Sequence, residues 1–396
     1  MERSHVLVIG GGLIGCATAW HLARAGAAVT LVEAGEINAG ASGQNAGSLH
    51  FQMERRFLEN GAALADQAQR IVALNRLAIQ EWRGIEADLG ADLHVSQRGG
   101  LMVAETAEQV TLLEDKTRRE QAEGLGTVML DGDTARALCP ALGDTVLAAS
   151  HLADEGHADP RTVTPAFARA AQAAGATLAM RTRVRALARR ASGGFDATLE
   201  DADGVRTLHA SQMLVAAGAW TPAVCALANL HMPLFPVALL MNATERTGPL
   251  LPQLIQHVGR RLSMKQAFAG NVLIGGGWPS LLAQKPGGGF DLDAKATILP
   301  AARSANLRAA IDIVPAVGAL NLIRSWTGIT TISADQLPIV GEVSRVPGFF
   351  VAAGGSAFTL GPSFARLLAE AIGGGRAAAL DVVSPDRFNH LNSFMG

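Results

Sequence analysis

The segment HVLVIGGGLIGCATAWHLARAGAAVTLVE, residues 5–33, predicts the unit around which the rest of the chain folds. Residues 5–9 are a short apolar run rich in β-branched side chains, and the glycine-rich turn after them leads into a helical pattern over residues 16–25. Gly26 ends that helix, and residues 28–32 form a second apolar run. A strand, a helix and a second strand in this order are typical of a parallel β-α-β unit.

The glycines of this unit have the spacing G-x-G-x-x-G. Gly10 allows a tight turn, Gly12 lets a pyrophosphate approach the backbone, and Gly15 lets the helix pack close to the strand. The free N–H groups of the helix start then favour an anion. Glu33 follows at the distance expected of an acid that binds ribose hydroxyls, and it would repel the 2′-phosphate of NADP. The unit predicts a dinucleotide site, although it leaves NAD and FAD open; a glycine turn that binds nothing is the alternative.

Composition limits the class of protein. The chain has 396 residues, of which 49% are hydrophobic, enough to bury one large or two medium cores. The formal net charge is −2 and no long basic run occurs, which argues against nucleic acid as a partner. No apolar stretch approaches the roughly 18 residues of a spanning helix, and the N-terminus leads straight into a strand without a leader. We therefore expect a soluble, cytoplasmic protein without a transmembrane segment; peripheral contact with a membrane stays open.

The cysteines and histidines predict no metal site. Cys16, Cys139 and Cys225 lie far apart and are odd in number, so they indicate neither a disulfide framework nor a metal cluster. The ten histidines show no H-x-x-x-H pairing. We interpret Cys16 as a small core residue of the first helix.

Two further segments have the composition of ligand-binding loops. Residues 38–48, NAGASGQNAGS, are small or amide residues that can wrap a ligand; a mobile surface loop is the alternative. Near the C-terminus, residues 349–353 predict a strand, residues 354–362 a glycine-rich turn and residues 363–372 a helix. This second strand-turn-helix unit would bring another helix N-terminus to the ligand.

The middle of the chain predicts two kinds of sheet. Residues 62–89 predict one long helix and residues 105–123 a polar amphipathic helix. The apolar run within residues 212–220 suits a buried strand of a parallel sheet. Residues 233–241 and 261–278 instead predict strands of a second, more antiparallel sheet.

Seven motifs together resemble the D-amino-acid oxidase superfamily of FAD-dependent amine oxidoreductases. They are VIGGGLIG at 8–15, ASGQNAG at 41–47, DP at 159–160, VAAGAW at 215–220, WTG at 326–328, DQLPIVG at 335–341 and FTLGP at 358–362. The resemblance covers nearly the whole chain. It is strongest to the bacterial branch that contains glycine oxidase, D-amino-acid dehydrogenase and the β subunits of sarcosine oxidase, opine oxidase and hydroxyproline dehydrogenase.

The resemblance implies an α/β plus α+β architecture with two interleaved domains. A FAD-binding Rossmann domain of the glutathione-reductase type would comprise residues 1–88, 145–225 and 325–396. A mixed-sheet substrate domain would comprise residues 89–144 and 226–324, and its sheet would cover the flavin ring.

Motif matching also implies which residues contact FAD. Ser42, Asn45 and Gly47 would lie along the pyrophosphate and flavin, and Val184 would meet the adenine through its backbone. The full set expected at the cofactor is Gly10, Gly12, Leu13, Ile14, Gly15, Glu33, Ala34, Ser42, Gln44, Asn45, Ala46, Gly47, Ser48, Val184, Ala217, Gly218, Trp220, Gly328, Asp335, Gly354, Gly355, Ser356, Ala357, Phe358 and Thr359.

The chain departs from some relatives at the flavin and at the substrate. Relatives with covalent flavin carry a cysteine in or close after the segment that matches residues 325–328, whereas this chain has none there, which implies noncovalent FAD. Many relatives have His-Gly where this chain has Ser356 and Ala357. Glycine oxidase places a carboxylate-binding arginine where this chain has Thr330 and Thr331, so the sequence does not identify the carboxylate anchor.

Three residues are candidates for the catalytic site. His50 directly follows the flavin loop, and a surface or core histidine is the alternative. Lys265 lies on a predicted strand of the substrate domain, and a lysine near flavin N5 serves oxygen activation in some relatives. Arg324 would hold a substrate carboxylate or, as the favoured alternative, form an ion pair that fixes the turn at Trp326.

In such an enzyme the flavin accepts a hydride from the C–H bond next to an amine, and the imine product hydrolyses, so neither a nucleophile nor a metal is needed. We therefore predict oxidation of the C–N bond of an amino acid, imino acid or N-substituted amino acid that is opine-like, D-hydroxyproline-like or sarcosine-like. The chain would be the catalytic β subunit of a dehydrogenase hetero-oligomer with companion electron-transfer subunits.

Three alternatives stay open at this point. A self-sufficient glycine or D-amino-acid oxidase would produce hydrogen peroxide. An NAD-dependent dehydrogenase would share the first motif but would not explain the block from Asp335 to Pro362. A flavin-bearing structural subunit would have the same motifs without catalysis.

Overall fold

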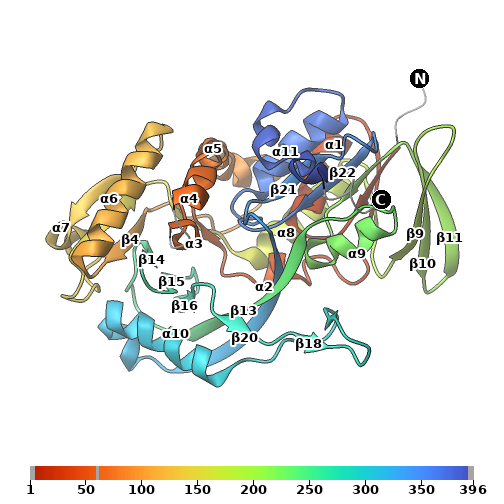
Figure 1. Ribbon diagram of the computed structural model, residues 1–396. Helices are drawn as coiled ribbons and strands as arrows, with labels where there is room; N and C mark the ends of the chain where they lie inside the picture. Colours follow the sequence, from red (N-terminus) through yellow and green to blue (C-terminus); the bar gives the residue numbers. More distant parts are fainter. Residues whose placement is uncertain (1–4, 59–61, 391–396) are drawn as a thin grey trace.

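The computed structural model describes residues 5–58 and 62–390, and a six-stranded sheet forms the centre of one half of the molecule (Figure 1). The strand order is β21-β22-β12-β1-β2-β8, in which all neighbours are parallel except the pair β21–β22. The strands are β1 (His5–Ile9), β2 (Ala28–Val32), β8 (Thr177–Ala179), β12 (Gln212–Val215), β21 (Ile339–Glu342) and β22 (Phe349–Ala353).

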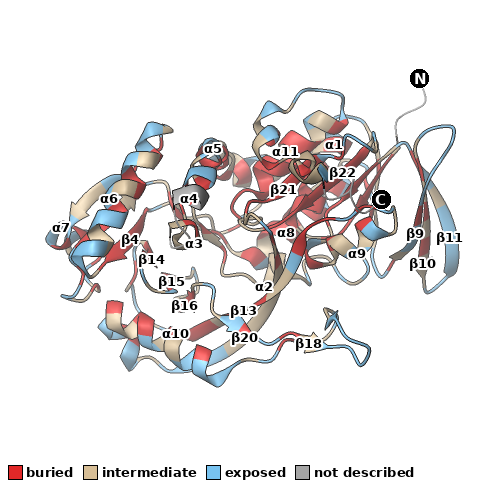
Figure 2. Cartoon of the chain, in the orientation of Figure 1, coloured by how far each residue is buried: buried red, intermediate tan, exposed pale blue. Residues whose placement is uncertain are grey.

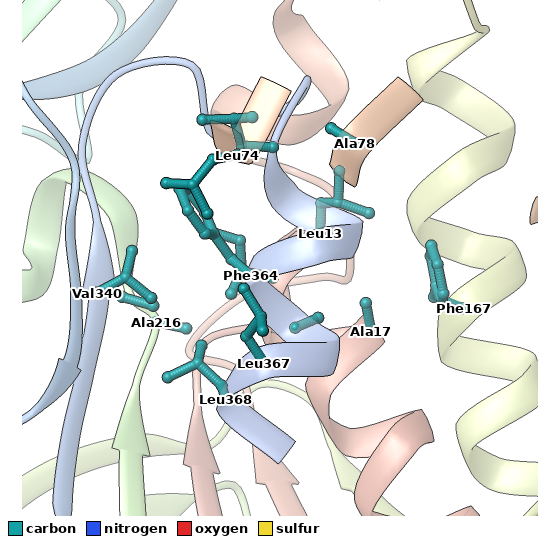
Figure 3. Close-up of a cluster of buried hydrophobic side chains, with 14 of the residues drawn as sticks. Leu13, Ala17, Leu74, Ala78, Phe167, Ala216, Val340, Phe364, Leu367 and Leu368 are labelled. Carbon is teal, nitrogen blue, oxygen red and sulfur yellow. The ribbon is translucent and has the colours of Figure 1, made fainter. Parts of the chain in front are cut away.

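Four helices pack together over one face of this sheet. They are α1 (Leu13–Arg24), α5 (Val72–Leu89), α8 (Pro160–Ala173) and α11 (Gly361–Ile372). Figure 3 shows Phe364, Leu367 and Leu368 of α11 beside Leu13 and Ala17 of α1 in the buried cluster that joins them. Removal of this apolar surface from water holds the β-α-β unit against the C-terminal segment.

A three-stranded antiparallel sheet packs on the other face. It consists of β9 (Arg183–Arg189), β10 (Phe195–Asp201) and β11 (Gly204–Ala210). Its side chains Leu187, Phe195 and Leu199 share a buried cluster with Leu7 and Val215 of the six-stranded sheet. Both faces of the parallel strands are therefore covered, as their near-continuous apolar sequences predict.

The other half of the molecule is built on a nine-stranded mixed sheet. Its order is β17-β13-β16-β15-β14-β4-β6-β5, and β20 pairs with β13. The strands are β4 (Gly100–Ala104), β5 (Val128–Asp131), β6 (Ala148–Leu152), β13 (Leu234–Arg246), β14 (Leu254–His257), β15 (Ser263–Gln266), β16 (Asn271–Gly275), β17 (Pro279–Ser280) and β20 (Leu322–Ser333).

Three helices cover this mixed sheet. Helices α7 (Gly132–Leu138) and α10 (Pro300–Ile313) bury apolar side chains against one face, and α6 (Ala107–Ala122) packs beside β4 and β6. Figure 2 shows the outer sides of α6 and α10 exposed, whereas the strands of the six-stranded sheet are buried.

The remaining elements are short connections. They are α2 (Ala41–Gln44), α3 (Arg55–Leu58), α4 (Ala62–Gln69), α9 (Thr221–Ala226), β3 (Ser48–Leu49), β7 (Gly156–His157), β18 (Ala283–Gln284), β19 (Phe290–Asp291) and the 3₁₀ turns Gly218–Trp220, Pro315–Ala319, Ala378–Val383 and Pro385–Phe388.

The predicted architecture of a Rossmann-type unit with a mixed-sheet partner is confirmed, with differences in detail. The single helix predicted over residues 62–89 is wrong, because the backbone tightens at Arg70 and Ile71 to bonds three residues back and divides α4 from α5. Two strands bear on the expected domain bounds. Strand β6 lies within the segment 145–225 expected of the FAD domain, and β20 spans the expected boundary at residue 325, yet both pair in the nine-stranded sheet, β6 with β4 and β5 and β20 with β13. The division into two domains stays a prediction.

Two negative findings concern the described residues only. None of their helices combines the length and apolar character that a membrane crossing requires. No three histidine, cysteine, aspartate or glutamate residues within 5–58 and 62–390 are grouped so as to hold a metal ion.

Candidate cofactor and substrate site

A cavity of about 710 Å³ lies where the parallel strands of the six-stranded sheet end. Its walls include residues at the carboxyl ends of β1, β2, β12 and β22, which is where open α/β sheets bind their ligands. Its volume falls in the range of roughly 300–1,000 Å³ that small-molecule and cofactor sites occupy.

The glycine turn presents bare backbone to this cavity. Gly10 has φ +118°, and a Cβ there would lie 2.4 Å from the carbonyl oxygen of Ala216. A Cβ on Gly15 would lie 2.0 Å from the oxygen of Gly10, so α1 packs directly against its own turn. Gly12 begins α1 without a side-chain cap, and the N–H of Leu13 donates to Ser42 Oγ at 3.0 Å. The uncapped N–H groups beyond fit the pyrophosphate of a dinucleotide.

Two backbone N–H groups hold the carboxylate of Glu33, one from the glycine turn and one from the segment after β2. One oxygen accepts a hydrogen bond from the N–H of Gly11 at 2.7 Å, and the other accepts from the N–H of Gly35 at 2.7 Å. Because each carboxylate oxygen has a second lone pair, both can still accept from ribose hydroxyls. The side chain therefore fixes the turn and faces the expected ribose position.

The loop of residues 38–48 is folded by its own amide side chains. Asn45 accepts a hydrogen bond from the N–H of Gly47 at 2.6 Å and donates to the carbonyl oxygens of Ala41 and Ser42. Gly47 has φ +73°, and a Cβ there would lie 2.0 Å from the oxygen of Ala158. Asn45 and Gly47 thus shape the loop, while Ser42 and Gln44 line the cavity.

The structure divides the predicted cofactor residues into two groups. The residues that line the cavity are Gly10, Gly12, Leu13, Ile14, Glu33, Ala34, Ser42, Gln44, Val184, Ala217, Gly218, Trp220, Gly354 and Ala357. The residues outside its lining are Gly15, Asn45, Ala46, Gly47, Ser48, Gly328, Asp335, Gly355, Ser356, Phe358 and Thr359. Contact of any of them with FAD stays a prediction.

Two of the residues outside the lining support the walls instead. Asp335 pairs with Arg387 at 2.8 Å and accepts a hydrogen bond from Ser333. Burial raises the pKa of its carboxyl, but the pair with Arg387 and the hydrogen bonds from Ser333 and the N–H of Leu337 together outweigh burial and lower the pKa. A Cβ on Gly328 would lie 3.2 Å from the Cβ of Gln44. Glycine therefore lets β20 pack closely against α2.

The turn after β22 is hydrogen-bonded to the loop of residues 38–48, to the start of α3 and to α5. Ser356 donates to Glu54 at 2.8 Å and accepts from Arg56 at 3.1 Å. The carbonyl oxygen of Thr359 accepts from the indole N–H of Trp82 at 2.7 Å, and its hydroxyl donates to the oxygen of Ser48 at 3.4 Å. These bonds hold the turn that follows β22 against the loop that follows β2.

His50 joins the two sheets. Its backbone N–H donates to Thr359 Oγ1 at 3.3 Å, and its Nε2 lies 3.1 Å from the Oγ of Ser263 on β15. Its Nδ1 is buried without a hydrogen-bond partner among the described residues. Burial lowers the pKa of His50 to about 4, so the ring is neutral near pH 7 and Nδ1 keeps an unused hydrogen-bonding position.

Lys265 lies near His50, at the junction between the six-stranded and the nine-stranded sheet, which is here called the seam. Met264 points into the core under α10, so the alternation of a strand places Ser263 and Lys265 on the opposite face, toward His50. Lys265 is 2% exposed, and burial lowers its pKa well below the ordinary value. Neither His50 nor Lys265 is part of the lining of the 710 Å³ cavity.

Arg324 lies on the exposed start of β20. Its guanidinium is 5.5 Å from the ring centroid of Trp326, whose indole N–H donates to the oxygen of Gln44 at 2.8 Å. Arg324 also lies outside the lining of the cavity. The geometry favours the interpretation that Arg324 supports Trp326, here by cation–π contact, over a role as carboxylate anchor.

The sequence analysis missed one part of the cavity wall. Residues 292–296 reach it from the hairpin of β18 and β19, far from the Rossmann-type unit in the sequence. The local sequence does not predict this contact, because the contact depends on the direction in which the β18–β19 hairpin leaves the nine-stranded sheet.

Comparison with known proteins agrees with this geometry. The chain matches the family model described as DAO, FAD dependent oxidoreductase, over residues 5–371. It is 25% identical over 394 residues to the B subunit of opine oxidase from Rhizobium meliloti, a match that covers 98% of this chain and 99% of that protein. It is 24% identical to glycine oxidase of Bacillus licheniformis, over 94% of this chain and 93% of that one.

The fold is similar to that of glycine oxidase from Geobacillus kaustophilus. The crystal structure of that protein superposes with a TM-score of 0.83 at 24% identity and covers 98% of this chain and 99% of that chain. The family match spans nearly all the described residues, and the glycine turn, Glu33 and the uncapped start of α1 fit a dinucleotide. The predicted cofactor and enzyme class are confirmed: the chain belongs to the DAO family of FAD-dependent oxidoreductases.

Proposed function

We propose that this protein oxidises the C–N bond of an amino acid, imino acid or N-substituted amino acid whose carboxylate enters a buried basic cluster. The cluster consists of His50, His157 and Lys265. The observation that carries the proposal is that Lys265 is buried at the seam of the two sheets with no hydrogen-bond or ion-pair partner among the described residues. A buried amine in that position needs an anion to become charged.

The electrostatics of the cluster favour an anionic ligand. Burial and the charge of Lys265 lower the pKa of His157 to about 3, and burial lowers the pKa of Lys265 itself. The carboxylate of Asp159 acts on both groups, but it is paired with Arg161 at 2.6 Å. A substrate carboxylate would therefore supply the negative charge that the cluster lacks.

The residues of the chain would divide the work as follows. FAD, held by the glycine turn, Glu33 and Ser42, supplies a hydride acceptor for the C–H bond next to nitrogen. Lys265 binds the carboxylate and so orients that carbon. When Nε2–H of His50 donates to Ser263, Nδ1 has a free lone pair that accepts a hydrogen bond from the substrate amine.

The proposed substrate class is supported by the name of a relative that matches end to end. The B subunit of opine oxidase aligns over 98% of this chain, and opines are N-substituted amino acids, so we propose opines as the first candidates. Anaerobic addition of opines, D-hydroxyproline, sarcosine, glycine and D-amino acids to the holoenzyme tests this. We expect opine-like or D-hydroxyproline-like compounds to bleach the flavin absorption fastest. Bleaching by none of these compounds would refute the proposal.

We also propose that the chain is the catalytic subunit of a hetero-oligomer, because that relative is named as one subunit of its enzyme. A self-sufficient oxidase is the second candidate, favoured by the similarity to glycine oxidase and by the buried Lys265. Stopped-flow reoxidation separates them. Slow reoxidation in air that an artificial dye accelerates supports the role as a subunit, whereas fast reoxidation with peroxide formation by the isolated chain supports the oxidase.

The absence of a cysteine near Trp326 supports noncovalent FAD. The three cysteines are Cys16, Cys139 and Cys225, all buried and none within the lining of the cavity. Acid precipitation should therefore release all yellow colour into the supernatant. Flavin that stays on the precipitated chain would show a covalent bond.

A further inference from the structure

A separate two-stranded hairpin, which follows β17 in the chain, reaches the cofactor cavity. Strands β18 and β19 pair at Ala283 with Asp291 and at Gln284 with Phe290, and the next bridge joins Leu281 to Thr297. One residue separates the paired positions on the first arm. The second arm has residues 292–296 in the same interval, and this bulge forms part of the cavity wall.

The bulge is anchored at both ends. Ala296 is buried with Leu282 and Ala238, and its carbonyl oxygen accepts a hydrogen bond from Thr327 of β20 at 3.3 Å. At the other end, Asp293 accepts from the indole N–H of Trp220 at 3.2 Å and lies 3.7 Å from Arg183 of β9. The bulge therefore spans from the nine-stranded sheet to the strand expected at the adenine.

Charge distinguishes Lys295 from the other cations of the wall. Among the described residues, the lining of the cavity includes three basic residues: Arg183, Arg185 and Lys295. Arg183 pairs with Asp293, and Arg185 pairs with Glu200. Lys295 has no acidic partner among residues 5–58 and 62–390. Its backbone lies between Asp293 and Ala296, which are both anchored.

We propose that Lys295 binds the pyrophosphate of FAD from the side of the nine-stranded sheet and that residues 292–296 cover the ADP half of the cofactor. Asp293 reaches the adenine end of the cavity, and Ala296 reaches β20, which packs on α2 near the flavin end. Lys295 lies between these two anchored residues in the chain, so its ammonium group would meet the two phosphate charges in the middle of a bound dinucleotide. The start of α1 would bind the pyrophosphate from one side and Lys295 from the other.

The test compares Lys295→Met with Lys285→Met and Lys295→Arg. Lys285 lies in the same hairpin, is exposed and does not line the cavity, so Lys285→Met controls for loss of one positive charge. The release of FAD from each holoenzyme on dilution is followed by the rise in flavin fluorescence. Loss of a charge-assisted hydrogen bond should make FAD binding about tenfold to a hundredfold weaker in Lys295→Met.

A second measurement separates the phosphates from the rest of the cofactor. ADP and adenosine are compared as competitors of FAD rebinding to the apoprotein. We expect Lys295→Met to weaken the binding of ADP by a factor similar to that for FAD and to leave the binding of adenosine unchanged. Lys295→Arg should bind both FAD and ADP with affinities close to those of the wild type. Equal weakening of ADP and adenosine, or FAD release as slow in Lys295→Met as in Lys285→Met, would overturn the assignment. Neither readout depends on the substrate.

Discussion

Among single residues, Glu33 links the glycine turn to the end of β2 and faces the cavity. It accepts hydrogen bonds from the N–H groups of Gly11 and Gly35. A glutamine at this position keeps the shape but loses the charge, and its amide nitrogen would face a backbone donor. Stability and cofactor affinity are therefore coupled at this residue.

We expect Glu33→Gln to weaken FAD binding by about ten- to a hundredfold, because a charge-assisted hydrogen bond contributes roughly 1.5–3 kcal/mol. Quenching of flavin fluorescence on titration of the apoprotein measures the Kd. Glu370→Gln, on the exposed side of α11, is the matched control. An unchanged Kd in Glu33→Gln would show that the carboxylate serves only the turn.

We expect Lys265 to lower the free energy of unfolding of the protein and to contribute to substrate binding. In Lys265→Met an apolar chain of similar length replaces a buried amine without a partner among the described residues, which should raise the free energy of unfolding by about 1–3 kcal/mol. The same variant should raise the KM of an amino-acid substrate at least about tenfold if Lys265 binds the carboxylate.

Urea unfolding of the holoenzyme and anaerobic flavin reduction measure these two effects. Lys285→Met should change neither, because Lys285 is exposed. A Lys265→Met variant that is less stable, with an unchanged KM, would place Lys265 in a structural role. A variant with an unchanged KM and slower reoxidation by oxygen would favour the oxidase alternative.

Among the elements, helix α1 depends on how closely it packs on β1. A Cβ on Gly15 would meet the backbone oxygen of Gly10, which cannot move without the turn. By contrast, Gly84 lies within α5, and a Cβ there would have only Asp88 Oδ2 at 3.8 Å as a neighbour. The same substitution should therefore have opposite effects in the two helices.

We expect Gly15→Ala to lower the free energy of unfolding by about 1–3 kcal/mol and to weaken FAD binding, because α1 must shift away from the turn. Gly84→Ala should raise the free energy of unfolding by about 0.5–1 kcal/mol, since alanine favours the helix. Urea unfolding of the apoproteins measures both changes. Equal stability of the two variants would contradict this account of the packing.

For the whole molecule, five histidines have lowered pKa values that affect stability in acid, and for four of them the shift is large. Burial lowers the pKa of His21, His50 and His257 to about 4 and that of His157 to about 3. The unfolded chain binds protons near pH 6.5 and the folded chain does not, so their contribution is present above pH 6.5 and is lost as the pH falls toward 4. Burial raises the pKa of Glu155 to about 7, which opposes this trend for one group only.

We therefore expect the holoenzyme in excess FAD to lose stability between pH 7 and pH 5, by about 1 kcal/mol per pH unit for each neutral histidine. Urea midpoints at the two pH values measure the loss. His21→Gln should reduce the slope, because it removes one histidine whose protonation the folded chain disfavours. Equal or greater stability at pH 5 would contradict the prediction.

Local spacing was sufficient to predict the β-α-β unit and a dinucleotide site, whereas the choice of FAD came from the resemblance of seven motifs to a known family. The turn at Gly10, the packing of Gly15 and the position of Glu33 depend on residues within one supersecondary unit, so their roles follow from the sequence alone. The helix over residues 62–89 was predicted less well. Its periodicity continues through Arg70 and Ile71, and only the backbone bonds of the folded chain divide it.

Only the tertiary structure decided which distant residues come together at the cavity and between the two sheets. His50 meets Ser263, and Lys295 reaches a cavity that begins at Gly10, so each contact joins residues more than 200 positions apart. Such contacts depend on the pairing of β15 with its neighbours, because a slip of one residue would turn Lys265 to the opposite face of the sheet. Sequence spacing specifies the unit that binds a dinucleotide, whereas strand register and the direction of the β18–β19 hairpin specify the rest of the site.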